Sequence, residues 1–280
     1  MAPAEIPEEA ASGTIGDIYA DIRATLGVPM VNTIYRHLAI APAALEWAWS
    51  AVRPHMLSGA VARQADVLRQ DVRGALQAAR PASPIGPLRV PPRRRRDARR
   101  LVHAYDVANC LNLVALTHLL RQADGLPAPD ATRYAGMASP APGDAAPASL
   151  PAIPALDSLP PDVQACLQRL NRFGERNPPA AVAGLYRHLA AWPQLLAPVE
   201  AWLRPWEQCG ALLAAREAAV RSVAGQADRH PLGMPTPRAD ILARFREPLQ
   251  RYCHAIIPKM VPVCQLLDDA LARPGQHATG

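Results

Sequence analysis

The sequence predicts an all-α protein built from two tandem helical repeats. Alanine, leucine and arginine fill long stretches with helical spacing, whereas the alternating β-branched runs that strands favour are nearly absent. The segment Tyr35-Arg36-His37-Leu38-Ala39 recurs as Tyr186-Arg187-His188-Leu189-Ala190, 151 positions later (186 − 35 = 151). The ungapped match of residues 35–74 to 186–225 holds 13 identities in 40 positions. We infer an internal duplication.

The two repeats are expected to pack about a pseudo-two-fold axis, as the halves of a symmetric dimer do. Shared prolines and glycines weigh most in this inference, because they fix helix starts and turns. Pro42 matches Pro193, and Gly59 matches Gly210. The surface between the repeats is then the natural place for a site.

Apolar spacing and breakers predict the elements of the first repeat in order. One face of residues 14–26 carries isoleucines, and Gly27 and Pro29 end that helix. A short helix follows over 30–38, Pro42 opens one over 43–56, and Gly59 precedes one that runs to residue 79. A proline-rich irregular segment separates it from a long helix over 94–123.

The second repeat is expected to follow the same plan. The predicted helices span 162–173, 182–192, a helix opened by Pro193, 210–225 and 239–271. The composition thus divides the chain into five parts. These are a lead-in over residues 1–13, a first helical repeat over 14–123, an alanine- and proline-rich linker over 124–161, a second repeat over 162–272 and a tail over 273–280.

Much of the net charge of +6 comes from one run of arginines. Within Arg93–Arg100 only Asp97 and Ala98 interrupt the arginines. The favoured interpretation is a solvated, basic helix start, and the rival is a patch that binds acidic partners or nucleic acid. No aromatic residues interleave with the arginines, so a nucleic-acid partner is not expected.

The cysteines and the hydropathy indicate the compartment. The five cysteines form no CxxC pair, and most lie in apolar helical patterns, which is typical of free thiols in a reducing environment. No apolar run approaches the roughly 20 residues of a membrane span. We expect a cytoplasmic protein without a membrane partner, and a homodimer is compatible with the sequence.

Several familiar catalytic motifs are missing. The chain has no GxxxxGK[ST] loop, GxGxxG turn, HExxH or GxSxG, so no cofactor is expected. His37 and His188 suggest a symmetric metal pair, but no carboxylate or cysteine recurs in register with them, and no metal site is predicted. Arg36 and Arg187 either bridge the two repeats or include one arginine that holds an anionic substrate.

A polar cluster lies in the long helix of the first repeat. Asp106, Asn109 and Asn112 follow one another at three-residue spacing among apolar neighbours. Buried polar groups need partners. The cluster therefore either makes structural hydrogen bonds between the repeats, which is favoured, or holds a water molecule in a pocket.

Two stretches of the chain resemble a known family. The first is Ile18-Tyr19-x-Asp21-Ile22-Arg23-x-Thr25-Leu26-x-Val28-Pro29, followed by Arg36-x-Leu38-Ala39 and Pro42. The second is Leu189-Ala190-x-Trp192-Pro193, with Gln250-Arg251. Both are similar to the group I 2-haloacid dehalogenases, the DehI type, which are also duplicated.

The resemblance implies an all-helical pseudo-dimer with a pocket between the repeats. It implies that an aspartate of the second repeat and an asparagine of the first hold a water molecule that attacks the halogen-bearing carbon. Halide then leaves with inversion, without a covalent intermediate, cofactor or metal.

The same resemblance assigns positions in this chain. Asn109 matches the water-holding asparagine, while Leu185 stands where the family has the water-activating aspartate. A leucine cannot accept a proton, so Asp106 is the candidate substitute base. The matching substrate-pocket positions are Met30, Asn32, Thr33, Gly184, Leu185, Leu249, Cys253 and Ile256.

The leading functional hypothesis is hydrolysis of a small 2-halo carboxylic acid, a carbon–halogen hydrolase reaction with inversion. The loss of the aspartate at Leu185 argues for weak turnover. The first alternative is a relative without this catalysis that binds a small carboxylic acid between the repeats. The second is an interaction protein that uses the Arg93–Arg100 patch.

Overall fold

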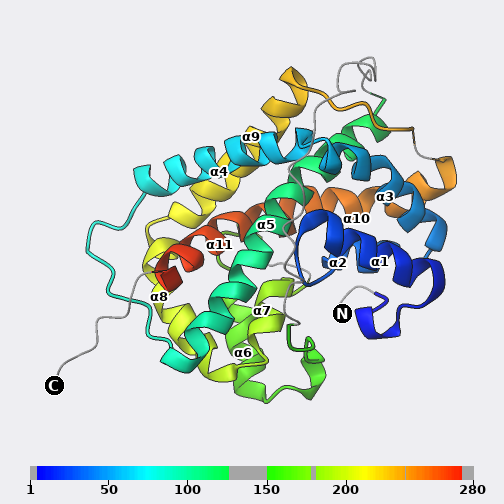
Figure 1. Ribbon diagram of the computed structural model, residues 1–280. Coiled ribbons are helices and arrows are strands. Elements are labelled where there is room, and N and C mark those ends of the chain that lie inside the picture. The colour runs from blue at the N-terminus through cyan, green and yellow to red at the C-terminus, as the bar shows by residue number, and fades with distance from the viewer. Residues whose placement is uncertain (1–4, 126–149, 178–180, 237, 273–280) are drawn as a thin grey trace.

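A computed structural model describes residues 5–125, 150–177, 181–236 and 238–272. Within these ranges every regular element is helical and none is a strand, which confirms the all-α prediction (Figure 1). The first of the two predicted repeats comprises α1 (Gly13–Leu26), α2 (Thr33–Leu38), α3 (Pro42–Leu57), α4 (Ala60–Ala78) and α5 (Pro92–Ala123). The second comprises α6 (Pro161–Leu170), α7 (Gly184–Leu189), α8 (Leu196–Gln208), α9 (Ala211–Arg229), α10 (Ala239–Arg251) and α11 (Ile257–Ala272).

Four short elements complete the description. The 3-10 turns η1 (Glu8–Ala10), η3 (Leu156–Ser158) and η4 (Pro193–Leu195) precede α1, α6 and α8, and the π-helical turn η5 (Tyr252–Ile256) joins α10 to α11. Most of the predicted linker and all of the predicted tail lie outside the described residues. The division into five parts stays a prediction.

The helix bounds repeat along the chain at the offset found in the sequence. The helices α2 and α7, and likewise α4 and α9, begin and end 151 positions apart (184 − 33 = 211 − 60 = 151). Gly59 and Gly210 directly precede α4 and α9 with φ of 71° and 78°, a left-handed conformation that residues with a Cβ adopt only under strain. The repeated glycine therefore fixes the same turn twice.

Equivalent helices of the two repeats lie against each other. In Figure 1, α4 and α9 run side by side across the top, and α5 and α11 meet at the centre. A two-fold rotation between the repeats would bring these pairs together, and that rotation stays a prediction. The buried apolar residues form one continuous cluster, so the repeats share a single core.

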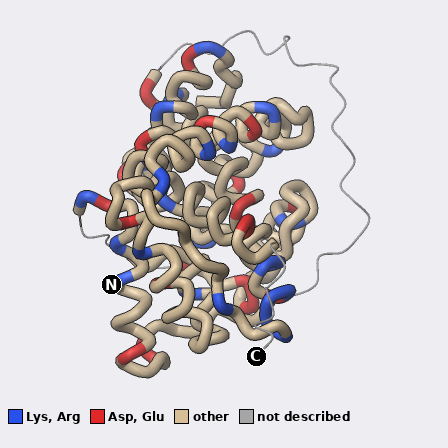
Figure 2. The backbone as a smooth tube through the Cα atoms, turned by 90° about the vertical axis from the view of Figure 1, so that its left-hand side faces the viewer, with Lys and Arg blue, Asp and Glu red and all other residues tan. Residues whose placement is uncertain are grey.

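Arg94 and Arg95 of the basic run have partners elsewhere in the chain. Arg95 donates to the carbonyl oxygens of Ala270 and Leu271, both at 3.3 Å, at the end of α11. Arg94 lies over the Trp192 ring. The carbonyl end of a helix attracts cations, so this part of the run stabilises the end of α11. Figure 2 shows basic and acidic residues interspersed along the backbone.

The described part of the chain contains no helix long and apolar enough to cross a membrane. Its five cysteines are all unpaired, and only Cys209 is exposed. Lys259 of α11 is the only lysine in the sequence, and its side chain is buried.

Candidate active site

A small cavity lies where α2, α5, α7 and the η5–α11 segment meet. Its volume is about 30 Å³, which is room for one or two water molecules. The residues that line it are Asn32, Thr33, Ile34, Tyr105, Asn109, Ala183, Gly184, Leu185, Tyr252, Ile256, Ile257 and Met260.

Ten of these twelve lining residues form five equivalent pairs of the two repeats. The pairs are Asn32 with Ala183, Thr33 with Gly184, Ile34 with Leu185, Tyr105 with Tyr252, and Asn109 with Ile256. The first three pairs follow the offset of 151, and the last two follow the offset of 147 between α5 and its counterpart. The cavity is therefore built from the same positions of both repeats.

The two repeats give the cavity unlike walls. The first contributes two amides and a hydroxyl from Asn32, Asn109 and Thr33, whereas their counterparts in the second are alanine, isoleucine and glycine. The Asn32 amide nitrogen lies 3.5 Å from Asn109 Oδ1, and the Asn109 amide nitrogen donates to Cys264 Sγ at 3.7 Å. Asn32 Oδ1 is buried without a hydrogen-bond partner, so a water or ligand donor suits this wall.

Gly184 allows two hydroxyls to approach the second repeat. A Cβ at this position would lie 3.1 Å from Tyr105 Oη and 3.2 Å from Thr33 Oγ1. Contacts this short would force both side chains to move. The glycine therefore keeps space beside the two polar groups.

A tyrosine–histidine pair adjoins the cavity. Tyr105 Oη lies 3.3 Å from His188 Nδ1, and His188 Nε2 lies 2.5 Å from the carbonyl oxygen of Pro151. A carbonyl only accepts, so Nε2 carries the hydrogen in the neutral ring, and Nδ1 accepts the Tyr105 hydroxyl proton. The ring thus receives a hydrogen bond from a residue that lines the cavity.

Burial sets the protonation of this pair. It lowers the pKa of His188 to about 4, with the positive charges of Arg36 and Arg187 acting in the same direction and the Pro151 carbonyl opposing them. Burial also raises the pKa of Tyr105 above its usual value. At neutral pH both groups are uncharged, and the lone pair of His188 Nδ1 accepts the hydrogen bond of the Tyr105 hydroxyl.

The equivalent histidine has a different role. His37 packs edge-on against Phe245 at 5.9 Å between ring centroids. Among the described residues, no group of three or more His, Cys, Asp or Glu side chains is placed to hold a metal ion.

Asp106 does not line the cavity. Its Oδ2 accepts a hydrogen bond from Arg69 Nε of α4 at 3.1 Å. Burial raises the pKa of Asp106, and the Arg69 charge opposes this. The side chain is placed to anchor α5 to α4.

The other residues predicted for the site divide into two groups. Asn32, Thr33, Asn109, Gly184, Leu185 and Ile256 line the cavity. Met30, Leu249 and Cys253 are buried and do not line it. Leu185 is fully buried and gives its wall an apolar surface where the resemblance placed an aspartate.

Several lining residues were not predicted from the sequence. Ile34 and Ala183 are the repeat counterparts of the predicted Leu185 and Asn32, so applying the 151-residue offset to each predicted position would have found them. Tyr252 was not predicted and lies on η5 with the predicted Ile256, and π-helical turns often occur at functional sites. Nothing in the sequence signalled that this turn was π-helical.

Comparison with known proteins gives a consistent picture. No protein-family model matches the chain. A segment of 52 residues is 42% identical to an (R)-2-haloacid dehalogenase of Pseudomonas putida, and it covers 19% of this chain and 17% of that protein.

Solved structures match over nearly the whole chain. A D-2-haloacid dehalogenase mutant superposes with a TM-score of 0.75 at 18% sequence identity, covering 95% of both chains. A mutant in complex with D-2-CPA gives 0.71 at 17% identity, covering 96% of this chain and 93% of that one. The enzyme in complex with L-LA gives 0.68 at 18% identity, covering 96% and 94%. The chain thus has the fold of the D-2-haloacid dehalogenases and resembles an (R)-2-haloacid dehalogenase in sequence over one segment.

Proposed function

We propose that the chain hydrolyses a small 2-halo carboxylic acid in the cavity between its repeats. The observation that carries this proposal is the wall of Asn32, Thr33, Asn109 and Tyr105 at the junction of the repeats, in a chain with the fold of D-2-haloacid dehalogenases. This wall supplies donors and acceptors for one water molecule. A two-fold rotation between the repeats, with the cavity on its axis, is part of the proposal, and the five equivalent lining pairs support it.

The reaction is a direct displacement by water. The Asn109 amide orients the water, whose oxygen forms a bond to C2 on the side opposite the halogen. The carbon–halogen bond breaks, and halide leaves with the bonding electrons. The product is a 2-hydroxy acid of inverted configuration, and one water proton must pass to a base.

Tyr105 and His188 are the groups best placed to take this proton. Leu185 has no acceptor, and the Asp106 carboxylate is engaged by Arg69. As the water proton passes to Tyr105 Oη, the tyrosine's own hydrogen passes to His188 Nδ1, 3.3 Å away. With a pKa of about 4, His188 has the basicity of an ordinary aspartate.

Chloride release from both enantiomers of 2-chloropropionate tests the proposal. We expect Tyr105→Phe and His188→Gln each to lower kcat by about 10²–10⁴-fold, the usual contribution of a general base. The control His37→Gln changes the equivalent histidine, which packs on Phe245, and should retain activity within about twofold. Release should also fall as pH drops through about 4, where His188 becomes protonated. Turnover that survives both variants would refute this assignment of the base.

A second candidate function is binding of a small carboxylic acid without hydrolysis. The buried Leu185 favours it, because a leucine cannot accept the proton of an attacking water. In that case the native chain would release no chloride, 2-chloropropionate would still raise Tm, and Leu185→Asp would create turnover by restoring a carboxylate. Native turnover dependent on Tyr105 would exclude this candidate.

We also propose a cytoplasmic location. Five unpaired cysteines, four of them buried, suit a reducing compartment. Fractionation of the native host with detection of the chain would test it, and recovery outside the cytoplasm would contradict it.

A further inference from the structure

The segment before η1 places a carboxylate between two equivalent arginines. Glu5 Oε1 accepts a hydrogen bond from Arg36 Nη2 at 2.8 Å and another from Arg187 Nη1 at 3.2 Å. Positions 36 and 187 correspond at the repeat offset, so each repeat contributes one guanidinium. The three side chains are only 6%, 13% and 14% exposed for Arg36, Arg187 and Glu5. Two cations thus face one anion in a largely buried site.

Glu5 accepts hydrogen bonds from only some of the donors of the two guanidinium groups. One carboxylate oxygen takes both hydrogen bonds, while Glu5 Oε2 and the Nε groups of Arg36 and Arg187 are buried without partners. Each guanidinium presents five donors in a fixed fork, and a carboxylate bound through both oxygens suits that geometry better. The arginine pair is therefore an incompletely filled carboxylate site.

The pair lies one helical turn from the cavity. Arg36 follows Thr33 on α2, and Arg187 follows Gly184 on α7, in each case by three residues. This spacing puts each arginine on the same helix face as the lining residues. Both guanidinium charges also act on Tyr105 and Tyr252, which line the cavity, and partly offset the rise in pKa that burial gives these tyrosines.

The chain around Glu5 is held in place without its carboxylate. The Ile6 amide donates to the Arg36 carbonyl at 3.0 Å, and Tyr19 Oη donates to the Ile6 carbonyl at 2.9 Å. Glu8 pairs with Arg23 and accepts from the Val31 amide. The Glu5 side chain can therefore leave the arginines while the segment stays docked.

We propose that Arg36 and Arg187 form a binding site for the carboxylate of a small acid, and that Glu5 fills this site in the free chain and competes with the acid. The inference rests on the proposed function only for the class of ligand. A bound acid would have its carboxylate at the arginines and its C2 toward Asn109.

Binding of propionate, which has no halogen to lose, tests this inference independently of turnover. We expect Glu5→Gln to bind propionate at least about tenfold more tightly than the native chain in calorimetric titration, because a site occupied nine-tenths of the time by Glu5 lowers the apparent affinity by that factor. The Tm of Glu5→Gln should rise with propionate concentration and not with chloride at equal ionic strength. The control Glu9→Gln removes the same charge from an exposed position nearby and should bind as the native chain does.

An arginine variant keeps the inference testable if Glu5→Gln fails to fold. Arg187→Gln keeps the Glu5–Arg36 pair, and it should weaken propionate binding by at least about tenfold, the cost of one charge-assisted hydrogen bond. Adding Arg187→Gln to Glu5→Gln should abolish the gain in affinity. Equal affinity in the native chain and Glu5→Gln, or affinity unaffected by Arg187→Gln, would overturn the inference. Absence of chloride release would refute the proposed hydrolysis and leave these binding results unaffected.

Discussion

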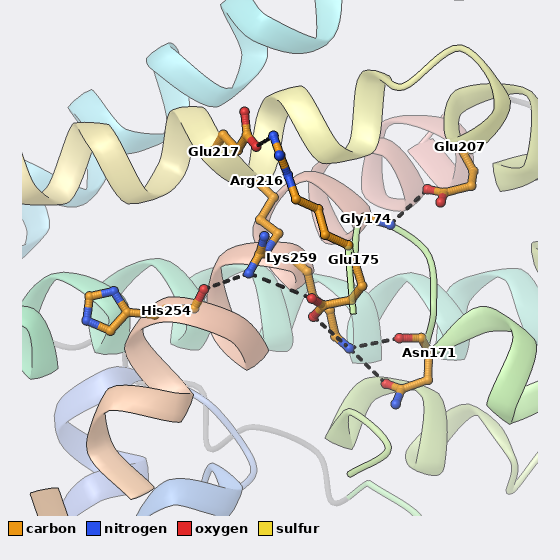
Figure 3. A network of polar contacts seen from close by, with 9 residues as sticks. Asn171, Gly174, Glu175, Glu207, Arg216, Glu217, His254 and Lys259 are labelled. Atoms are coloured by element: carbon orange, nitrogen blue, oxygen red, sulfur yellow. Dashed lines mark hydrogen bonds and ion pairs between the residues drawn. The ribbon is translucent and has the colours of Figure 1, made fainter. Parts of the chain in front are cut away.

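Lys259 is the strongest case for a pH-dependent contribution to stability. The ammonium donates to the Asn171 carbonyl at 2.9 Å and to Asn171 Oδ1 at 3.1 Å, and it lies 3.3 Å from Glu175 Oε1 (Figure 3). Arg216 is the other charge at this site, 3.7 Å from Glu175. The lysine is 1% exposed, and burial lowers its pKa from 10.5 to about 8, although Glu175 acts in the opposite direction.

This shift determines the sign and size of the effect. Because the folded pKa lies below the unfolded value, the unfolded chain binds more protons between pH 8 and 10.5, and stability rises with pH in that window. Below pH 8 the protonated lysine costs the fold about 3 kcal/mol, from the change of 10.5 to about 8 at about 1.4 kcal/mol for each tenfold step. Most of that cost, about 2.5 kcal/mol, should disappear between pH 7 and 10.

Urea unfolding of the native chain and of Lys259→Met measures this contribution. The difference in unfolding free energy between the two proteins should shift by about 2–3 kcal/mol in favour of the native chain from pH 7 to 10. The tyrosines and cysteines of the unfolded chain also lose protons over this range, but they do so in both proteins, and their contributions cancel. Since Lys259 is the only lysine, NMR with isotope-labelled lysine follows its titration directly. A midpoint near 10.5, or a difference independent of pH, would show that Glu175 fully offsets the effect of burial and would refute this reasoning.

Three further substitutions and one control test the site and its supports. Gly184→Ala should lower propionate affinity at least about tenfold in titration, since its Cβ would contact two cavity hydroxyls. Unchanged affinity would show that propionate does not bind in the cavity. Gly210→Ala should cost about 1–2 kcal/mol in urea unfolding because φ there is 78°, whereas Gly74→Ala, in open space within α4, should be neutral or stabilising. Asp106→Asn should cost about 1–3 kcal/mol by removing the charge that Arg69 Nε contacts. Chloride release should stay within about twofold of native, and a hundredfold loss would identify Asp106 as the base.

The duplication made most of the fold predictable from the sequence. The glycines before α4 and α9 and the prolines that open α3 and η4 are local signals, and the predicted helices lie close to the observed ones. The predicted helix over 30–38 begins instead at Thr33, because Asn32 is extended with ψ of 145°. The predicted helix over 239–271 is interrupted by η5, whose wider turn depends on packing around the cavity.

The site was less accessible to sequence reasoning because its contacts join distant residues. Three-residue spacing on α5 rotates successive side chains by about 60°, so Asp106, Asn109 and Asn112 meet different neighbours. Asp106 bonds Arg69, Asn109 faces Asn32, and Asn112 accepts from Tyr35 Oη at 2.9 Å. The Tyr105–His188 bond spans 83 positions, and no local pattern marks it.

Because the chain has a single lysine and that lysine is buried, cleavage after it can report the opening of α11. An endoprotease that cuts only after lysine has one peptide bond to cleave, after Lys259 within α11, and that bond is protected while the helix stays packed against α5 and α9. Where opening and closing are faster than cleavage, the rate of appearance of the two fragments measures the population of the opened form. The same digestion, run with increasing propionate, would measure ligand binding as protection of the bond between Lys259 and the cavity-lining Met260.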